Sequence, residues 1–181
     1  MQPSSDEQLV VRLKAGDAEA FGELYERYRP RVYRFAFKLL RDGDQAEDIV
    51  QETLLKAQRS IHTLHQNHSL VSWLLSITRN EVYGQLRKTR SNGQVDVEDV
   101  WDTETPLDEV LGTETVVIVQ NMIAQLKPGY REVILLREYE HLSYADIARV
   151  TQDTESAVKA RLFKARKALV KKLKPYFGEQ S

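Results

Sequence analysis

The chain has 181 residues, 41% of them hydrophobic, and its 26 basic and 27 acidic side chains give a formal charge of −1. This length holds one or two domains, and the apolar content is enough for packed cores, which excludes a wholly disordered protein. The absence of cysteine excludes disulfides and thiolate chemistry, and the longest uncharged apolar stretch, residues 115–125, is too short to span a bilayer. The N-terminus has no signal-peptide pattern, so we expect a soluble, cytoplasmic protein.

The near-zero charge is an average over three unlike segments. Residues 1–90 carry +2, residues 91–115 carry −8 and residues 116–181 carry +5. Within the last segment, residues 159–174 contain eight Lys or Arg and no Asp or Glu. We therefore expect a first domain over 1–90, an acidic linker over 91–115 and a second domain over 116–181.

Apolar residues in the first domain recur at intervals of three and four, the period of an amphipathic α-helix. One run extends from Phe21 to Leu39, a second from Ala46 to Ala57 and a third from Leu70 to Leu86. Pro30 lies inside the first run, so a kink or a helix restart is expected there. Three or four helices of this size predict one bundle, and the chain as a whole is predicted to be all-α.

The segment after residue 90 changes in composition. Residues 91–110 contain seven acidic side chains and little periodicity, which is typical of a solvated linker because such a segment cannot bury enough surface to order itself. Trp101 is the exception, and we expect it to dock on a domain surface in some states.

The second domain has the pattern of a helix-turn-helix. A helix from residue 116 ends at the Lys-Pro-Gly break of residues 127–129, and further helical runs cover 130–139, 144–150 and 155 to about 173. Ser143, with Asp146 three residues later, is placed to cap the third run, and Thr154 to cap the last. The short turn between these two helices has the length that a helix-turn-helix uses.

The last helix is predicted to read DNA, because its first turns would enter the major groove. Glu155 favours specific recognition, since an acidic group near phosphates is useful mainly when it accepts from a cytosine amino group. The alternatives are a solvated basic face or a peptide for an acidic partner. The predicted duplex contacts are Glu155, Ser156, Lys159 and Ala160 at base edges, and Arg161, Lys164 and Arg166 at phosphates.

Three ordered motifs resemble those of the extracytoplasmic-function sigma factors, small promoter-recognition subunits of bacterial RNA polymerase of the sigma-70 type. They are DQAEDIVQETLLKA at residues 44–57, SWLLSITRN at 72–80 and LKPGYREVILLREYEHLSYADIA at 126–148. The resemblance covers about residues 18–90 and 118–173. It implies a domain that docks on the polymerase and opens the −10 element, and a second domain that recognises the −35 element.

The resemblance also implies which residues do this work. The first motif would dock on the clamp helices of the largest polymerase subunit, and the second domain would lie near the flap. Acidic side chains suit an Arg-rich partner through charge-assisted hydrogen bonds; the alternative is a solvated helix face. The matching polar positions are Asp44, Glu47, Asp48, Gln51 and Glu52.

The −10 strand would be bound single-stranded, which requires base pockets and cations along the backbone. Trp73 is expected to belong to the core rather than to a stacking platform. The predicted −10 contacts are the loop residues His65, Asn67 and Ser69 and the helix residues Asn80, Tyr83, Arg87 and Lys88.

Some positions depart from the family pattern, so the promoter preferences of relatives are not carried over to this chain. Gly84 and Gln85 replace more usual polar and aromatic residues, and Thr151 stands where a glycine is customary in the turn. The spacing of His62, His65 and His68 weakly suggests zinc, but no carboxylate lies among them, so we expect no metal, cofactor or catalytic group.

Two other classes of function remain open at this level. One is a helix-turn-helix repressor or activator that works without polymerase, and the other is an adaptor that uses the bundle for protein contacts. The acidic face of residues 44–52 distinguishes a sigma factor from a repressor or activator, because a repressor has no use for it. The resemblance further implies an anti-sigma protein as inhibitor, and a membrane-anchored form of it is one of the candidates.

Overall fold

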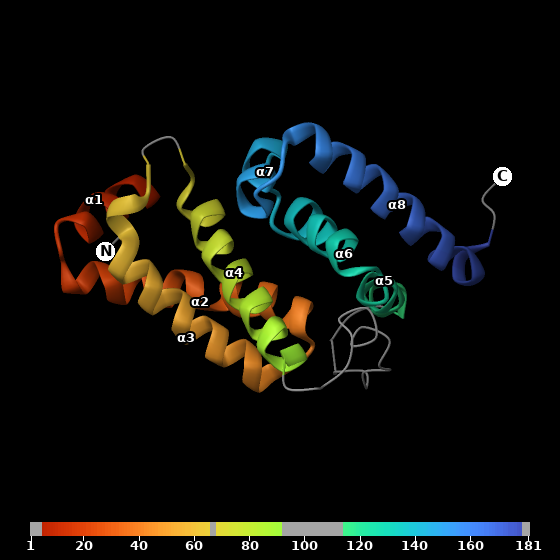
Figure 1. Cartoon of the computed structure of the whole chain (residues 1–181), viewed down its shortest axis with the longest axis horizontal. Coiled ribbons are helices and arrows are strands. Elements are labelled where there is room, and N and C mark those ends of the chain that lie inside the picture. The colour runs from red at the N-terminus through yellow and green to blue at the C-terminus, as the bar shows by residue number, and fades with distance from the viewer. Residues whose placement is uncertain (1–4, 66–67, 92–113, 179–181) are drawn as a thin grey trace. The chain divides into compact units, whose positions relative to one another are not determined.

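The computed structural model describes residues 5–65, 68–91 and 114–178, and these residues are helical, with no β-strand among them. They divide into two compact units, the first built on α1 to α4 and the second on α5 to α8 (Figure 1). The linker prediction for residues 92–113, including Trp101, lies outside the described residues.

The first unit contains four α-helices and one short 3₁₀ turn. They are α1 (Asp6–Lys14), α2 (Ala18–Leu40), α3 (Gly43–Ser60), η1 (Ile61–Thr63) and α4 (Leu70–Ser91). The helix α2 continues through Pro30, so of the expected kink or restart the structure excludes the restart; the apolar positions keep the same helical phase on both sides of the proline. Only residues 41 and 42 separate α2 from α3, which therefore pack against each other.

The helix α1 was not anticipated from the sequence. Its start is a capping box: the Gln8 backbone N–H donates to Ser5 Oγ at 3.3 Å, and the Ser5 N–H donates to Gln8 Oε1 at 3.1 Å. Leu9 and Leu13 on its inner face are buried. Arg27 of α2 reaches Asp6 at 2.9 Å, so α1 is held by both apolar contacts and an ion pair.

The core of the first unit is formed by inward positions of all its helices. Leu24 of α2, Leu54 of α3 and Leu74 of α4 are each at most 1% exposed. Trp73 is partly buried and packs against the core cluster, as expected for a core residue. The bundle therefore leaves the polar faces of α3 and α4 exposed on a firm support.

In the described residues, the second unit contains four α-helices and one π-helical segment. It comprises α5 (Glu114–Ala124), α6 (Pro128–Ile134), the π-helical η2 (Leu135–Tyr139), α7 (Tyr144–Thr151) and α8 (Glu155–Phe177). The inner face of α8, with Val158, Leu162 and Ala165 at most 1% exposed, packs against α6 and α5 (Figure 1). Ala157 and Leu169 of α8 are only half-buried.

Candidate functional site

The corner between α7 and α8 is fixed by local hydrogen bonds. The Asp146 N–H donates to Ser143 Oγ at 3.0 Å, and the Ala157 N–H donates to Thr154 Oγ1 at 3.2 Å, so both predicted caps are present. Ser143 Oγ also donates to the Asp146 carboxylate at 2.6 Å.

The turn that ends α7 is a Schellman motif. The Asp153 N–H donates to the Ala148 carbonyl at 2.9 Å, and Gln152 between them has the left-handed φ of 58°. Thr151 is the last residue of α7 and has no positive φ. The position that favours glycine is thus Gln152, one residue after the position singled out in the sequence.

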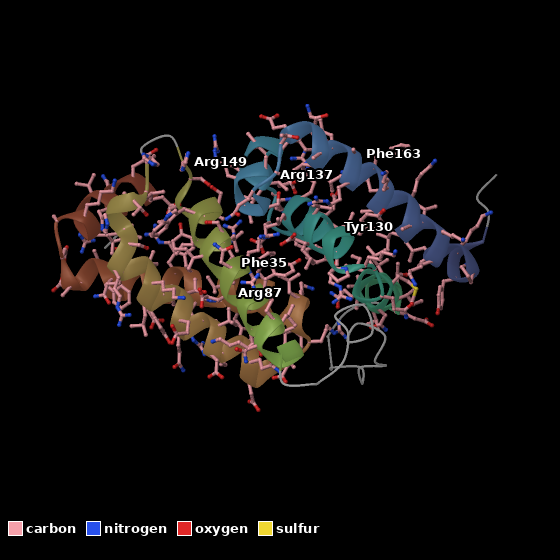
Figure 2. The ribbon with its side chains drawn as sticks, viewed as in Figure 1. Phe35, Arg87, Tyr130, Arg137, Arg149 and Phe163 are labelled. Atoms are coloured by element: carbon pink, nitrogen blue, oxygen red, sulfur yellow. The ribbon has the colours of Figure 1, made fainter. Side chains whose placement is uncertain are left out.

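The first turns of α8 present a face of mixed charge. Glu155, Ser156, Lys159, Ala160 and Lys164 are exposed, as predicted for duplex contacts. Phe163 is 61% exposed and lies on the same face, since it follows Ser156 and Ala160 at helical spacing (Figure 2).

Two arginines of the predicted phosphate set are paired within the chain. Arg161 Nη1 lies 2.7 Å from Asp153 Oδ2, and their side chains are 30% and 29% exposed. Arg166 Nη2 lies 2.7 Å from Glu138 Oε1 of η2, which raises the pKa of the arginine above its ordinary value through that hydrogen bond. Both guanidinium groups therefore hold elements of the domain together.

Two lysines on α8 lie over aromatic rings instead. Lys159 Nζ lies 5.3 Å from the centroid of Tyr144, whose ring is also 4.8 Å from Arg137 Cζ. Lys167 Nζ lies 5.0 Å from the centroid of Phe163. These distances are in the range of cation–π contacts.

The predicted docking face on α3 is exposed for four of its five residues. Asp44, Asp48, Gln51 and Glu52 are exposed on the outer side of the helix. Glu47 instead accepts two hydrogen bonds from Arg29 Nη2 of α2, at 2.8 and 3.0 Å. Part of the charge of Glu47 is therefore balanced within the chain.

The predicted −10 contacts fall into two groups. In the loop, His65 is exposed, and its ring lies edge-on to that of His68 with 5.4 Å between the ring centroids. Ser69 caps α4, since its Oγ accepts from the Ser72 N–H at 3.0 Å. Asn67 lies outside the described residues. On α4, Asn80, Arg87 and Lys88 are exposed, whereas Tyr83 is half-buried under the Arg79 guanidinium, 4.7 Å from its ring.

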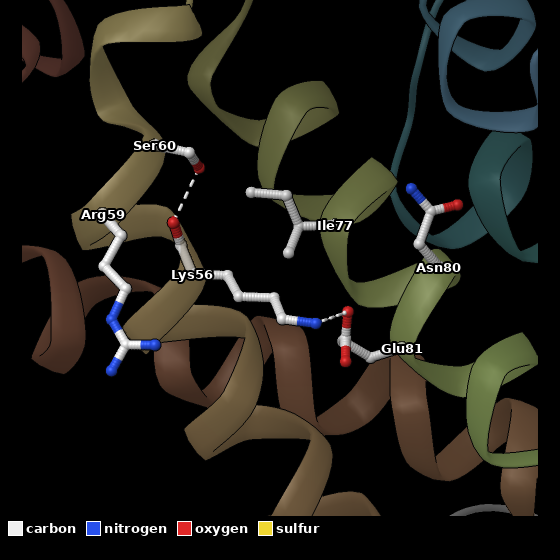
Figure 3. A pocket seen from close by; sticks show the side chains of 6 residues that line it. All are labelled: Lys56, Arg59, Ser60, Ile77, Asn80 and Glu81. Atoms are coloured by element: carbon white, nitrogen blue, oxygen red, sulfur yellow. Dashed lines mark hydrogen bonds and ion pairs between the residues drawn. The ribbon is translucent and has the colours of Figure 1, made fainter.

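A pocket of about 300 Å³ joins α3 to the predicted contact residue Asn80 of α4 (Figure 3). In it, Lys56 Nζ and Glu81 Oε1 form an ion pair at 2.6 Å, and the backbone carbonyl of Lys56 accepts from Ser60 Oγ at 2.6 Å. The lining residues are Lys56, Arg59, Ser60, Ile77, Asn80 and Glu81.

Lys56 and Arg59 were missed as contact candidates. Their only sequence signal was two basic residues on the polar side of a predicted amphipathic helix. What makes them candidates is the tertiary packing that brings α3 beside Asn80.

Within the described ranges, no helix is both long enough and apolar enough to cross a membrane.

Comparisons with known proteins match two regions of the chain to sigma-70 families. Residues 24–92 match the family Sigma-70 region 2, and residues 117–169 match Sigma-70, region 4. The chain is 32% identical to the RNA polymerase sigma-H factor of Pseudomonas aeruginosa over 96% of both chains. It is also 32% identical to the ECF RNA polymerase sigma-E factor of Haemophilus influenzae, over 94% of this chain and 96% of that protein.

Solved structures of sigma factors share the fold. The sigma factor RpoE of Bartonella quintana, crystallised with the anti-sigma factor NepR, is 28% identical and covers 87% of this chain and 98% of its own, with a TM-score of 0.72. CnrH, solved with the cytosolic domain of CnrY, has the same fold at 22% identity and a TM-score of 0.71, over 96% of this chain and 99% of its own. The chain belongs to the extracytoplasmic-function sigma factors of the sigma-70 family, non-enzymatic RNA polymerase subunits that direct transcription initiation to specific promoters.

Proposed function

We propose that three surfaces of this sigma factor divide its work: the outer face of α3 binds the polymerase, the α3–α4 pocket with α4 binds the −10 strand, and α8 binds the −35 duplex. The observation that carries the proposal is that the two family regions coincide with the helices that bear these surfaces. We retain 1–90, 91–115 and 116–181 as the proposed functional division of the chain.

The polymerase-binding surface is assigned to Asp44, Asp48, Gln51 and Glu52. These side chains are exposed on one helix that is fixed by its buried inner face, so they are available to a basic partner such as the clamp helices of the largest subunit. Glu47 has a different role in this proposal: it ties α3 to α2 through Arg29 and so keeps the docking helix in place.

The −10 surface combines cations and a base-sized pocket. Arg59 supplies positive charge for the backbone of a single strand, and Ile77 and Asn80 offer an apolar contact and an amide for a base, whereas Lys56 is paired with Glu81. The loop residues His65, Asn67 and Ser69 and the helix residues Tyr83, Arg87 and Lys88 extend this surface along α4 in the proposal.

The −35 surface is the exposed face at the start of α8. Glu155, Ser156 and Ala160 are assigned to base edges, and Lys159 and Lys164 supply positive charge near the phosphates. Arg161 and Arg166 are assigned to holding the domain, since each is already engaged with a carboxylate of the same unit.

An anti-sigma protein is the proposed inhibitor. The sigma factor RpoE, which has the same fold, was solved with the anti-sigma factor NepR, and CnrH, which also has this fold, was solved with the cytosolic domain of CnrY. By analogy, we propose that this sigma factor works in the cytoplasm and is held inactive by such a protein, anchored in the membrane. Co-purification from the native cell, scored for polymerase subunits and for a membrane-associated inhibitor, tests this; recovery of polymerase alone in unstimulated cells would contradict it.

The polymerase assignment is tested by the double variant Asp48→Arg with Glu52→Arg. Breaking close charge pairs at an interface costs about 2–5 kcal/mol, so binding to core polymerase and initiation in a reconstituted assay should both fall at least about thirtyfold. The matched control is Glu19→Arg with Glu26→Arg, which reverses two exposed acids on α2 and should bind like wild type. Equal affinity of the two double variants would refute the docking face.

A further inference from the structure

The cations of α8 are held in two different ways. Arg161 and Arg166 lie against carboxylates, each at 2.7 Å. Lys159 and Lys167 lie against the rings of Tyr144 and Phe163, at 5.3 and 5.0 Å. Within the described parts of the chain, neither of these lysines forms an ion pair.

This difference matters for a DNA-binding helix. A carboxylate holds a cation and also neutralises it, whereas the negative face of an aromatic ring attracts a cation and leaves its net charge in place. Binding to DNA gains from the counterions that each uncompensated protein cation displaces from the phosphates. A ring-held lysine is therefore oriented and still fully charged when it meets DNA.

Tyr144 is built to be a fixed support. It is the first residue of α7, directly after the capping Ser143, and its ring is half-buried. The guanidinium of Arg137, which contacts the same ring, is itself anchored because its Nη1 donates to the Leu142 carbonyl at 2.6 Å. The ring thus has a set position beside the flexible side chain of Lys159.

We propose that Tyr144 is a positioning residue for promoter binding, which holds the Lys159 ammonium toward a phosphate of the duplex. This rests on the proposed role of α8 at the −35 element. The ring face and not the hydroxyl is the active part, so phenylalanine should replace Tyr144 and an aliphatic side chain should not.

A double-mutant cycle on the full chain tests the proposal. The probe is a short fluorescein-labelled duplex, and its anisotropy gives the affinity over a series of NaCl concentrations. Lys159→Ala should lower the log–log salt slope by about one unit, the value for one lost phosphate contact. Tyr144→Met should lower the salt slope by the same amount or less, and it should cause no further change when combined with Lys159→Ala. Tyr144→Phe should have the salt slope of wild type.

Lys172→Ala is the matched charge control. It removes the same charge from the same helix on the opposite side, where Lys172 Nζ lies 3.3 Å from Gln125 Oε1 of α5, and it should leave the slope unchanged. An additive effect of Tyr144→Met and Lys159→Ala, or an unchanged slope for Tyr144→Met, would overturn the positioning role while the −35 assignment stands. An unchanged slope for Lys159→Ala would refute the −35 assignment itself.

An NMR measurement on the wild-type protein tests the contact between Tyr144 and Lys159 even if Tyr144→Met fails to fold. The ring current of Tyr144 should shift the NMR signals of the Lys159 ε-methylene protons upfield of those of the other lysines. The shift should persist in Tyr144→Phe. Lys159 signals at the ordinary position in wild type would overturn the proposal without any variant.

Discussion

Replacing Gln152 by glycine should stabilise the second unit. Gln152 has a φ of 58° at the end of α7, and its side chain is exposed, so the substitution removes backbone strain and few contacts. The Asp153 N–H to Ala148 carbonyl bond of 2.9 Å, which defines the turn, is made by the backbone and remains.

The expected gain is about 1 kcal/mol. An L-residue in the left-handed region costs roughly 1–2 kcal/mol because its Cβ approaches the following carbonyl oxygen. Glycine removes that cost but adds freedom to the unfolded chain, which takes back about 0.4–1 kcal/mol. A net gain of this size corresponds to about a fivefold change in the folded-to-unfolded ratio.

The assay is native-state hydrogen exchange of the amides in α7 and α8, which reports on this unit alone. The slowest of these amides should exchange about fivefold more slowly in Gln152→Gly, as the ratio above requires. Gln152→Ala is the control, because it removes the side chain and keeps the Cβ, and it should exchange like wild type. Equal exchange in wild type and Gln152→Gly, or equal slowing in both variants, would refute the backbone explanation.

Two further predictions concern the first unit. Gly84→Ala should raise its unfolding free energy by about 1 kcal/mol in urea denaturation, because an added Cβ meets no atom within 4 Å in the middle of α4; a loss of stability would contradict this. The Gln45 N–H that donates to Asp42 holds the pKa of Asp42 below its ordinary value, so Asp42 stabilises the fold above that value and loses this effect as the pH falls. Asp42→Asn keeps a cap without titrating, so its unfolding free energy should fall less than that of wild type on acidification from about pH 5 to about pH 2; parallel curves would refute the assignment.

Local chemistry was readable from the sequence alone. The caps at Ser143 and Thr154 depend on side chains bonding to backbone two or three residues away, and both are present. The helical periodicity likewise predicted the all-α fold and most helices. The helix α1 was missed because it is only nine residues long, although the spacing of Ser5 and Gln8 carried a capping signal.

Contacts between distant segments were not readable. Arg166 has the same sequence character as Lys164, but its partner Glu138 lies 28 residues earlier on η2. The pocket of Lys56, Arg59 and Asn80 likewise exists only because α3 and α4 pack together. Hydrophobic periodicity gives the face of a helix and leaves open which neighbour that face meets.

The π-helical segment η2 has a consequence for insertions and deletions. A π-turn contains one residue more than an α-turn, and each residue of an α-helix turns the chain by about 100°. Deleting one residue there would restore α geometry and rotate Arg137 and Glu138 relative to α7 and α8. The Tyr144 and Arg166 contacts would then both be lost. These two contacts therefore constrain the number of residues in η2, independently of its composition.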